Sequence, residues 1–369
     1  MPLQTATLTQ FATRTNWFLS ILLSTLLTTP LVLAESGLSE ADTAELIKLT
    51  YETRLDELPQ FKKGHYGLRL YRQTHDPRYI SAIESDLTRI ATRLDLFANT
   101  IDTEEEIAQY SLKRLLGYLD DYDERSRRRY HATQWTPEYL YLGVDLLGSM
   151  ARANEYGLKH KQDEKLRTIL KQYDFRFFVT DRDMIQAWAA QLANQVYWLK
   201  QLGEEDYTQL FVRRFKEVYP DNKDQELTKQ QFMNKLYGMT HIILADSEYY
   251  QRPVEESDYQ WIFDYFRDNQ DQILSATKED VIAEVGICFL LAGLEEDPFV
   301  AQAREAIRQS VDLQQGMVPS ETGSFDFAYG EHRNVLAIML LDWQPPRVGP
   351  TIDHHPEVFI NLPNGLVAK

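Results

Sequence analysis

The sequence predicts an all-α protein, an α/α toroid of about six helical hairpins, and three observations favour it. Glycine is sparse, with 16 in 369 residues, and the alternating β-branched runs typical of strands are nearly absent. Stretches that are apolar on nearly every face alternate with amphipathic, charged stretches. The starts of the apolar stretches are roughly 45 to 50 residues apart after a longer first interval, which indicates a repeat. An open α-solenoid of the same hairpins is the alternative.

Six stretches are expected to form the inner helices. Because a helix that is apolar all round is buried, these would line the inside of the ring, with the amphipathic helices outside it. Their positions are near 65–74, 137–152, 184–201, 233–246, 279–293 and 331–343. Four helix starts carry capping signals, and the residues that supply them are Ser39, Thr136 with Pro137, Thr277 with Asp280, and Asp297 with Pro298.

The N-terminus has the pattern of a secretory signal peptide. Arg14 precedes an apolar, uncharged run, and Val32 and Ala34 form a small-residue cleavage site before Glu35. We therefore expect 1–34 to be a cleaved signal peptide, 35–345 a single toroid domain and 346–369 a C-terminal tail. The mature protein would be periplasmic or secreted, with no membrane segment after cleavage.

Charge and cysteine content exclude several functions. The formal net charge is −17, and removing Arg14 would make it one unit more negative. Such an acidic chain is not expected to bind nucleic acid, which requires a basic surface. Cys288 is the one cysteine, so no intramolecular disulfide can form. A small molecule, a glycan or a peptide is the expected kind of substrate.

Three polar residues lie in the apolar helices of the C-terminal half. His241, Glu284 and His332 are 43 and 48 residues apart, about one hairpin each. Glu284 is the one charged residue between Val281 and Leu294, and a buried carboxylate requires a cation, a hydrogen-bond donor, a metal or water. The repeat should bring the three side chains together at one end of the ring.

Two chemistries are open to this group. His241, Glu284 and His332, with Cys288 as a further donor, are a suitable ligand set for zinc or another divalent ion. Without a metal, His241, Glu284 and His332 could act as catalytic acid and base, because burial raises the pKa of a glutamate towards neutrality. The structural alternatives are an internal hydrogen bond for Glu284, a hydrogen-bonded core histidine for His241 and an exposed first-turn residue for His332.

A second polar group lies in the N-terminal helix of the sequence HYGLRLYRQTHDPRY. His65, Arg69 and Arg72 fall within two turns of what should be an inner helix. They could bind an anionic group or pair with acidic residues across the ring, and Glu284 is one candidate partner.

Two resemblances add to this. The run QQGMVPSETGSFDFAYGEHRNVLAIMLLDW resembles the turn and His-led inner helix of α/α-toroid proteins of the terpenoid-cyclase, prenyltransferase and lanthionine-cyclase families. In the last two, Asp, Cys and His hold a catalytic zinc, and Glu284, Cys288, His332 and His241 are the nearest counterparts. The turn differs in having Met317 where those families have Asp.

The mature chain resembles an uncharacterised exported bacterial family, domain of unknown function 3541, in the motifs HYGLRLYRQTHDPRY and MTHIILADSEYY. This resemblance implies a helical barrel without an assigned activity. We therefore expect an enzyme, metal-dependent if the zinc set is real, that acts on a glycan or peptide at the barrel mouth. The alternative is a non-catalytic periplasmic binding or assembly module.

Overall fold

Helices make up almost the whole of the computed structural model, which describes residues 37–120 and 123–369. Its α-helices are α1 Glu40–Glu52, α2 Gln60–Thr74, α3 Ile80–Thr100, α4 Glu104–Leu116, α5 Glu124–Thr133, α6 Leu147–Glu155, α7 Asp163–Leu170, α8 Phe175–Thr180, α9 Arg182–Gln201, α10 Thr208–Val218, α11 Lys229–Asp246, α12 Gln260–Asp268, α13 Gln270–Ala276, α14 Glu279–Leu291, α15 Pro298–Ser310 and α16 Phe327–Leu341. A π-helix, Leu140–Leu146, leads into α6, and short 3₁₀ helices span Leu55–Glu57, Pro77–Tyr79, Gly117–Leu119, Asp221–Glu226, Glu256–Tyr259 and Pro356–Phe359. The predicted all-α class is confirmed.

Strands occur in the described residues as one small sheet. Its two strands, β1 Leu158–His160 and β2 Leu366–Ala368, are antiparallel, with Leu158 opposite Ala368. This sheet joins the end of the chain to the loop after α6.

All six stretches expected to be inner helices are helical. They correspond to α2, the π-helix with α6, α9, α11, α14 and α16. Their apolar side chains explain their burial, most fully in α14, where every residue from Val281 to Leu291 is buried.

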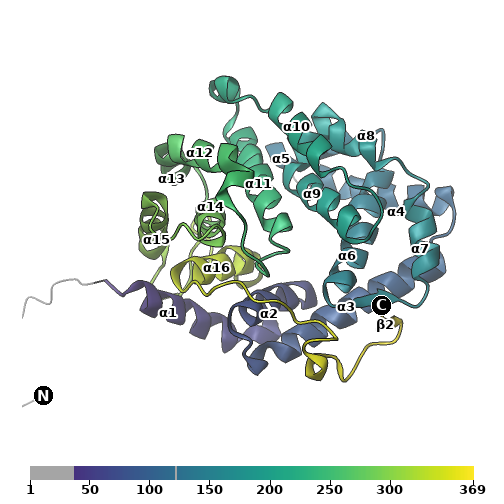
Figure 1. Ribbon diagram of the computed structural model, residues 1–369, viewed down its shortest axis with the longest axis horizontal. Helices are drawn as coiled ribbons and strands as arrows, with labels where there is room; N and C mark the ends of the chain where they lie inside the picture. The colour runs from purple at the N-terminus through teal and green to yellow at the C-terminus, as the bar shows by residue number, and fades with distance from the viewer. Residues whose placement is uncertain (1–36, 121–122) are drawn as a thin grey trace, which may run out of the picture. The chain divides into compact units, whose positions relative to one another are not determined.

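The inner helices contact one another in sequence order (Figure 1). Helix α3 lies between α2 and α6, α6 packs on α9, α9 on α11, α11 on α14, and α14 on α16. Helix α16 packs against α1 and α2, so the last inner helix meets the first. A closed arrangement requires this contact and an open stack does not; the toroid stays a prediction.

Helix starts follow the capping signals in part. Ser39 and Asp297 accept hydrogen bonds from the first-turn amides of α1 and α15, as expected. The prediction that Thr277 caps α14 is wrong, because its hydroxyl donates to the carbonyl of Ile273 in the preceding helix, 2.6 Å away. Helix α16 begins at Phe327, earlier than expected, because Asp326 caps it. His332 therefore lies in the second turn rather than at a helix start.

The C-terminal residues 346–369 are packed and do not form a free tail. The compact unit spans Leu38–Lys369. Besides the β2 pairing, the carbonyl of Gly349 accepts a hydrogen bond from the buried Arg72, and His355 contacts the hydroxyl of Tyr71. The expected signal peptide, 1–34, lies outside the described residues. Within the described ranges, no helix combines the length and apolarity needed to cross a membrane.

Candidate functional site

The three polar residues of the C-terminal inner helices converge on one carboxylate oxygen. Oε1 of Glu284, on α14, lies 3.7 Å from Nε2 of His241 on α11 and 3.5 Å from Nε2 of His332 on α16. Glu284 is almost completely buried, whereas the side chains of His241 and His332 are 17% and 33% exposed. Solvent therefore reaches both imidazoles but not the carboxylate that holds them.

Glu284 has a polar partner for each oxygen. Its Oε2 accepts a hydrogen bond of 2.7 Å from the hydroxyl of Thr240, which is also buried. Burial raises the pKa of Glu284, but the two neighbouring imidazoles outweigh this effect and hold the pKa well below its ordinary value. The shift is thus opposite to the expected upward one, and it favours the ionised form of Glu284. Its suggested pairing with Arg69 or Arg72 is also wrong, since the two histidines take that place.

His241 is hydrogen-bonded through one ring nitrogen, Nδ1. Its Nδ1 lies 2.9 Å from Oδ1 of Asn194 on α9. Because a carbonyl oxygen can only accept, Nδ1 carries the hydrogen and Nε2 faces Glu284. The ring also meets Tyr249 edge-on, with centroids 6.4 Å apart. His241 is therefore held in one orientation by three elements of the fold.

His332 has one ring nitrogen without a partner. Its Nε2 faces Glu284, and no other described residue makes a hydrogen bond to the ring. The ring of His65, on α2, packs at a tilt against it, with centroids 5.3 Å apart. Nδ1 of His332 thus has no hydrogen-bond partner among the described residues, and the side chain is one-third exposed.

A second histidine–carboxylate pair lies beside the first. Nδ1 of His65 is 2.6 Å from Oε1 of Glu331, and Nζ of Lys62 is 3.4 Å from Oε2. Burial lowers the pKa of His65 well below its usual value and raises the pKa of the fully buried Glu331. Both shifts favour the neutral forms of the two groups.

Sequence reasoning identified His65 but missed Glu331, Lys62, Asn194 and Thr240. Glu331 precedes His332 in a stretch that was expected to be the exposed first turn of a helix, where an acidic residue is normal. The sequence did hold one clue to its role. Asp326, more than one turn earlier, can cap the helix, so Glu331 is not needed as a capping residue. Asn194 and Thr240 carry no charge, and uncharged polar residues are too common in helices to stand out.

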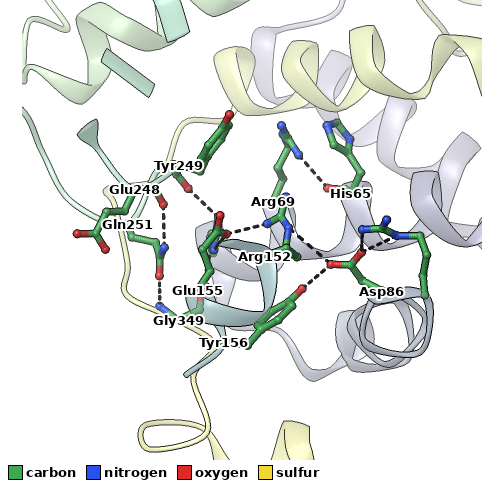
Figure 2. A network of polar contacts seen from close by, with 12 residues as sticks. His65, Arg69, Asp86, Arg152, Glu155, Tyr156, Glu248, Tyr249, Gln251 and Gly349 are labelled. Atoms are coloured by element: carbon green, nitrogen blue, oxygen red, sulfur yellow. Dashed lines mark hydrogen bonds and ion pairs between the residues drawn. The ribbon is translucent and has the colours of Figure 1, made fainter. Parts of the chain in front are cut away.

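Arg72 belongs to an ion-pair network next to the site (Figure 2). Its guanidinium lies 2.9 Å from a carboxylate oxygen of Glu155. Arg152 forms a second ion pair with the same carboxylate, at 2.8 Å. Arg152 lies 3.8 Å from Asp86, to which Tyr156 donates a hydrogen bond of 2.9 Å. Of the two alternatives for Arg72, binding an anion or pairing with an acidic residue, the structure shows an ion pair with Glu155.

The turn after α11 is strained and presents two tyrosines to this region. Glu248, Tyr249 and Tyr250 have φ values of 52°, 55° and 73°, in the left-handed region that non-glycine residues rarely adopt. Surrounding contacts maintain the turn: the carbonyl of Tyr249 accepts from Arg72, and the hydroxyl of Ser247 accepts from the amide of Tyr250. Such backbone strain is concentrated at functional sites.

Cys288 does not join the imidazoles. Its thiol lies 3.8 Å from the carbonyl of Thr240, and burial, followed by the charge of Glu284, raises its pKa well above the usual value. In residues 37–120 and 123–369, no three His, Cys, Asp or Glu side chains are arranged to hold a metal ion. The zinc set of His241, Glu284, Cys288 and His332 stays a prediction based on donor type.

Comparisons with known proteins give a family but no activity. No curated protein and no solved structure shows significant similarity to the chain. Residues 40–369, which contain every residue of the site, match the family described as Domain of unknown function (DUF3541). The chain belongs to this family of uncharacterised domains.

Proposed function

We propose that this protein is an enzyme in which His332, oriented by Glu284, exchanges protons with a substrate. The observation that carries the proposal is the position of Oε1 of Glu284, within 3.5 Å and 3.7 Å of two solvent-exposed imidazoles while Glu284 itself is buried. A purely structural carboxylate needs one partner and does not need to hold two histidines at the edge of solvent.

The chemistry follows from the two nitrogens of His332. A carboxylate facing Nε2 favours the tautomer with its hydrogen on Nε2, which leaves a lone pair on Nδ1. When Nδ1 accepts a proton, the anionic Glu284 stabilises the imidazolium, and the proton can later return to a leaving group. The imidazolium formed in this step favours the ionised form of Glu284 in turn, because its positive charge lowers the pKa of the carboxyl.

The other members of the site position this pair. Thr240 satisfies Oε2 of Glu284, and Asn194 fixes the ring of His241 against Oε1. The ring of His65, which is hydrogen-bonded to Glu331, packs against the ring of His332. Two carboxylates with opposite pKa shifts thus belong to this group, Glu284 facing His332 directly and Glu331 through His65, and opposite shifts suit separate acid and base roles.

We place this activity outside the cytoplasm, on a glycan or peptide, because the N-terminal sequence has the pattern of a cleaved signal peptide. A toroid would gather its loops around such a substrate at one end of the ring. The alternative, a non-catalytic periplasmic binding or assembly module, predicts scattered polar residues, and their convergence favours the enzyme.

Turnover assays on the purified mature chain test the proposal. Glycans and peptides would be screened for new reducing ends and new amino groups. We expect Glu284→Gln and His332→Asn each to lower kcat by about 10²–10⁴, with circular dichroism showing an unchanged fold. His131→Gln, at an exposed histidine of α5, is the matched control and should leave turnover unaffected.

A second measurement does not need a substrate. Nitrogen-15 chemical shifts of His332 above neutral pH should report hydrogen on Nε2 and a lone pair on Nδ1, and Glu284→Gln should remove this preference. If Nδ1 carries the hydrogen in the unmodified protein, or if the preference survives Glu284→Gln, the proposed pairing of Glu284 with His332 is wrong.

A further inference from the structure

Arg69 is a buried cation without an acidic partner. It is 7% exposed, and no carboxylate of the described residues lies within ion-pair distance. Its Nη1 donates a weak 3.4 Å hydrogen bond to the carbonyl of His65 (Figure 2). Its guanidinium lies 5.7 Å from the ring centroid of Tyr250, and its Nε has no hydrogen-bond partner. An unpaired buried charge is costly, so its presence calls for an explanation.

The neighbouring arginines show that acidic partners were available to this part of the fold. Arg72, one turn further along α2, and Arg152 on α6 share Glu155. The remaining carboxylates near Arg69 are engaged elsewhere, Glu284 by two imidazoles and Glu331 by His65 and Lys62. Of the three neighbouring arginines, Arg69 is therefore the one that forms no ion pair with a described carboxylate.

Arg69 lies at the edge of the proposed site. Its charge lowers the pKa of His65, after burial, and partly offsets the burial that raises the pKa of Tyr250 to about 12. The charge of Glu284 acts on the same tyrosine. Since the ring of His65 packs on His332, a ligand bound by Arg69 would lie close to His332.

We propose that Arg69 anchors a carboxylate of the substrate and thereby places the reacting group against His332. A guanidinium offers a planar fork of N–H donors that matches a carboxylate in two parallel hydrogen bonds. The substrate is accordingly acidic, either a uronic acid unit of a glycan or the terminal carboxylate of a peptide. This inference rests on the proposed function for its catalytic consequence, but the anion site can be tested alone.

Two small carboxylates serve as probes, galacturonate for the glycan source and N-acetylalanine for the peptide source, with galactose as the uncharged comparison. Calorimetry on the mature chain should detect binding of at least one carboxylate and none of galactose. Arg69→Gln should weaken that binding about ten- to hundredfold, and Arg69→Lys should retain part of it. Arg78→Gln, at an exposed arginine just after α2, should have no effect.

Thermal denaturation provides a readout independent of activity. The bound carboxylate should raise the Tm of the unmodified chain and of Glu284→Gln, but not that of Arg69→Gln. Without ligand, Arg69→Gln should keep or raise the Tm, because it removes an unpaired buried charge.

The outcomes separate the two proposals. Carboxylate binding that depends on Arg69 but comes with no turnover on any substrate retains the anion site and overturns the enzyme. Turnover that depends on Glu284, with carboxylate binding absent or unchanged in Arg69→Gln, retains the enzyme and overturns the anion site. The stronger of the two carboxylate ligands identifies the source of the acidic group.

Discussion

Thr240 supplies the single hydroxyl that contacts Glu284 among the described residues. It is fully buried, and its 2.7 Å hydrogen bond replaces the water that Oε2 would have in solution. A hydrogen bond to a charged group is worth more than one between neutral groups, because the unpaired anion would keep its full desolvation cost. The hydroxyl of Thr240 therefore affects both the stability of the fold and the pKa of Glu284.

We expect Thr240→Val, which keeps the shape and removes the donor, to lower the free energy of unfolding by about 2 kcal/mol at neutral pH. Thr240→Ser, which keeps the donor and loses a methyl group, should cost about 1 kcal/mol. Urea denaturation measures both. Thr168→Val, at an exposed hydroxyl that bonds only a helix carbonyl, is the control, with an expected change within about 0.5 kcal/mol.

The cost of Thr240→Val should depend on pH in a defined direction. The lowered pKa of Glu284 means that its anion stabilises the fold above the ordinary carboxyl value of 4.5, and that this contribution is lost as the pH falls towards the folded-state pKa. Because the valine variant has already lost part of the contribution, the two stability curves should converge at acid pH. A constant gap would show that Thr240 stabilises the fold independently of the charge on Glu284.

At the scale of secondary-structure elements, the turn after α11 determines where the tyrosines of the site lie. Left-handed backbone costs a residue with a Cβ about 1–2 kcal/mol relative to its preferred conformation, and three consecutive residues bear this cost. The sequence SEYY contains no glycine or asparagine, the residues that would predict such a turn. The conformation is imposed by the contacts of Ser247 and Arg72 and not by local preference.

Glu248→Gly should therefore stabilise the protein by about 0.5–1 kcal/mol, since glycine adopts positive φ without strain and this gain exceeds its greater entropy in the unfolded chain. The side chain of Glu248 is half exposed and makes one loose ion pair with Arg252, which contributes little. Glu248→Ala removes the same ion pair and keeps the Cβ, so it should leave stability unchanged. Equal unfolding free energies for the two variants would contradict the strain argument.

The sequence predicted the elements better than their ends. Periodic apolar stretches mark inner helices strongly, because their burial requires apolar residues on every face. The predicted start of α16 was too late in the sequence. Asp326 follows a polar turn in which several residues could cap a helix, so the sequence did not single it out. Thr277 looked like a cap for α14 but bonds backwards to Ile273, a choice that depends on the angle between two helices and that no local pattern reveals.

The site was predictable where burial conflicts with charge. Glu284 stands out because a carboxylate inside an apolar helix demands a partner, and the repeat spacing placed His241 and His332 beside it. The identity of that partner was not predictable, because the choice between Arg69, Arg72 and the histidines depends on how far each helix is rotated about its axis. The same rotation decides that Glu331 faces His65 and that Arg69 has no acidic partner.

At the scale of the whole molecule, Tyr51 joins the beginning of the chain to its end. Its buried ring stacks on Phe327 of α16 at 4.6 Å and on Tyr66 of α2 at 5.6 Å, and its hydroxyl donates to the carbonyl of Phe327 at 3.1 Å. Lys48 and Asp342 form an ion pair across the same junction. If the helices form a closed ring, this junction is the place where the ring closes.

Tyr51→Ala tests closure through the stability of distant helices. Loss of a buried aromatic ring should cost about 3–5 kcal/mol. In a closed ring that unfolds cooperatively, native-state hydrogen exchange should show the slowest amides of α9 and α11 losing the same free energy as those of α1 and α16. In an open solenoid, whose repeats interact only with their neighbours, the loss should stay near the chain ends and leave α9 protected.

Two variants separate closure from other effects of the substitution. Tyr51→Phe keeps the stacked ring and removes the hydroxyl, so it should cost about 1 kcal/mol, spread over the helices in the same way. Tyr329→Ala, at a fully solvent-facing tyrosine of α16 (86% exposed), should change neither the global nor the local exchange.

Loss of protection confined to α1, α2 and α16 in Tyr51→Ala would favour the open solenoid. Uniform loss would mean that the helices carrying His241, Glu284 and His332 are held in register by a contact at the opposite end of the sequence.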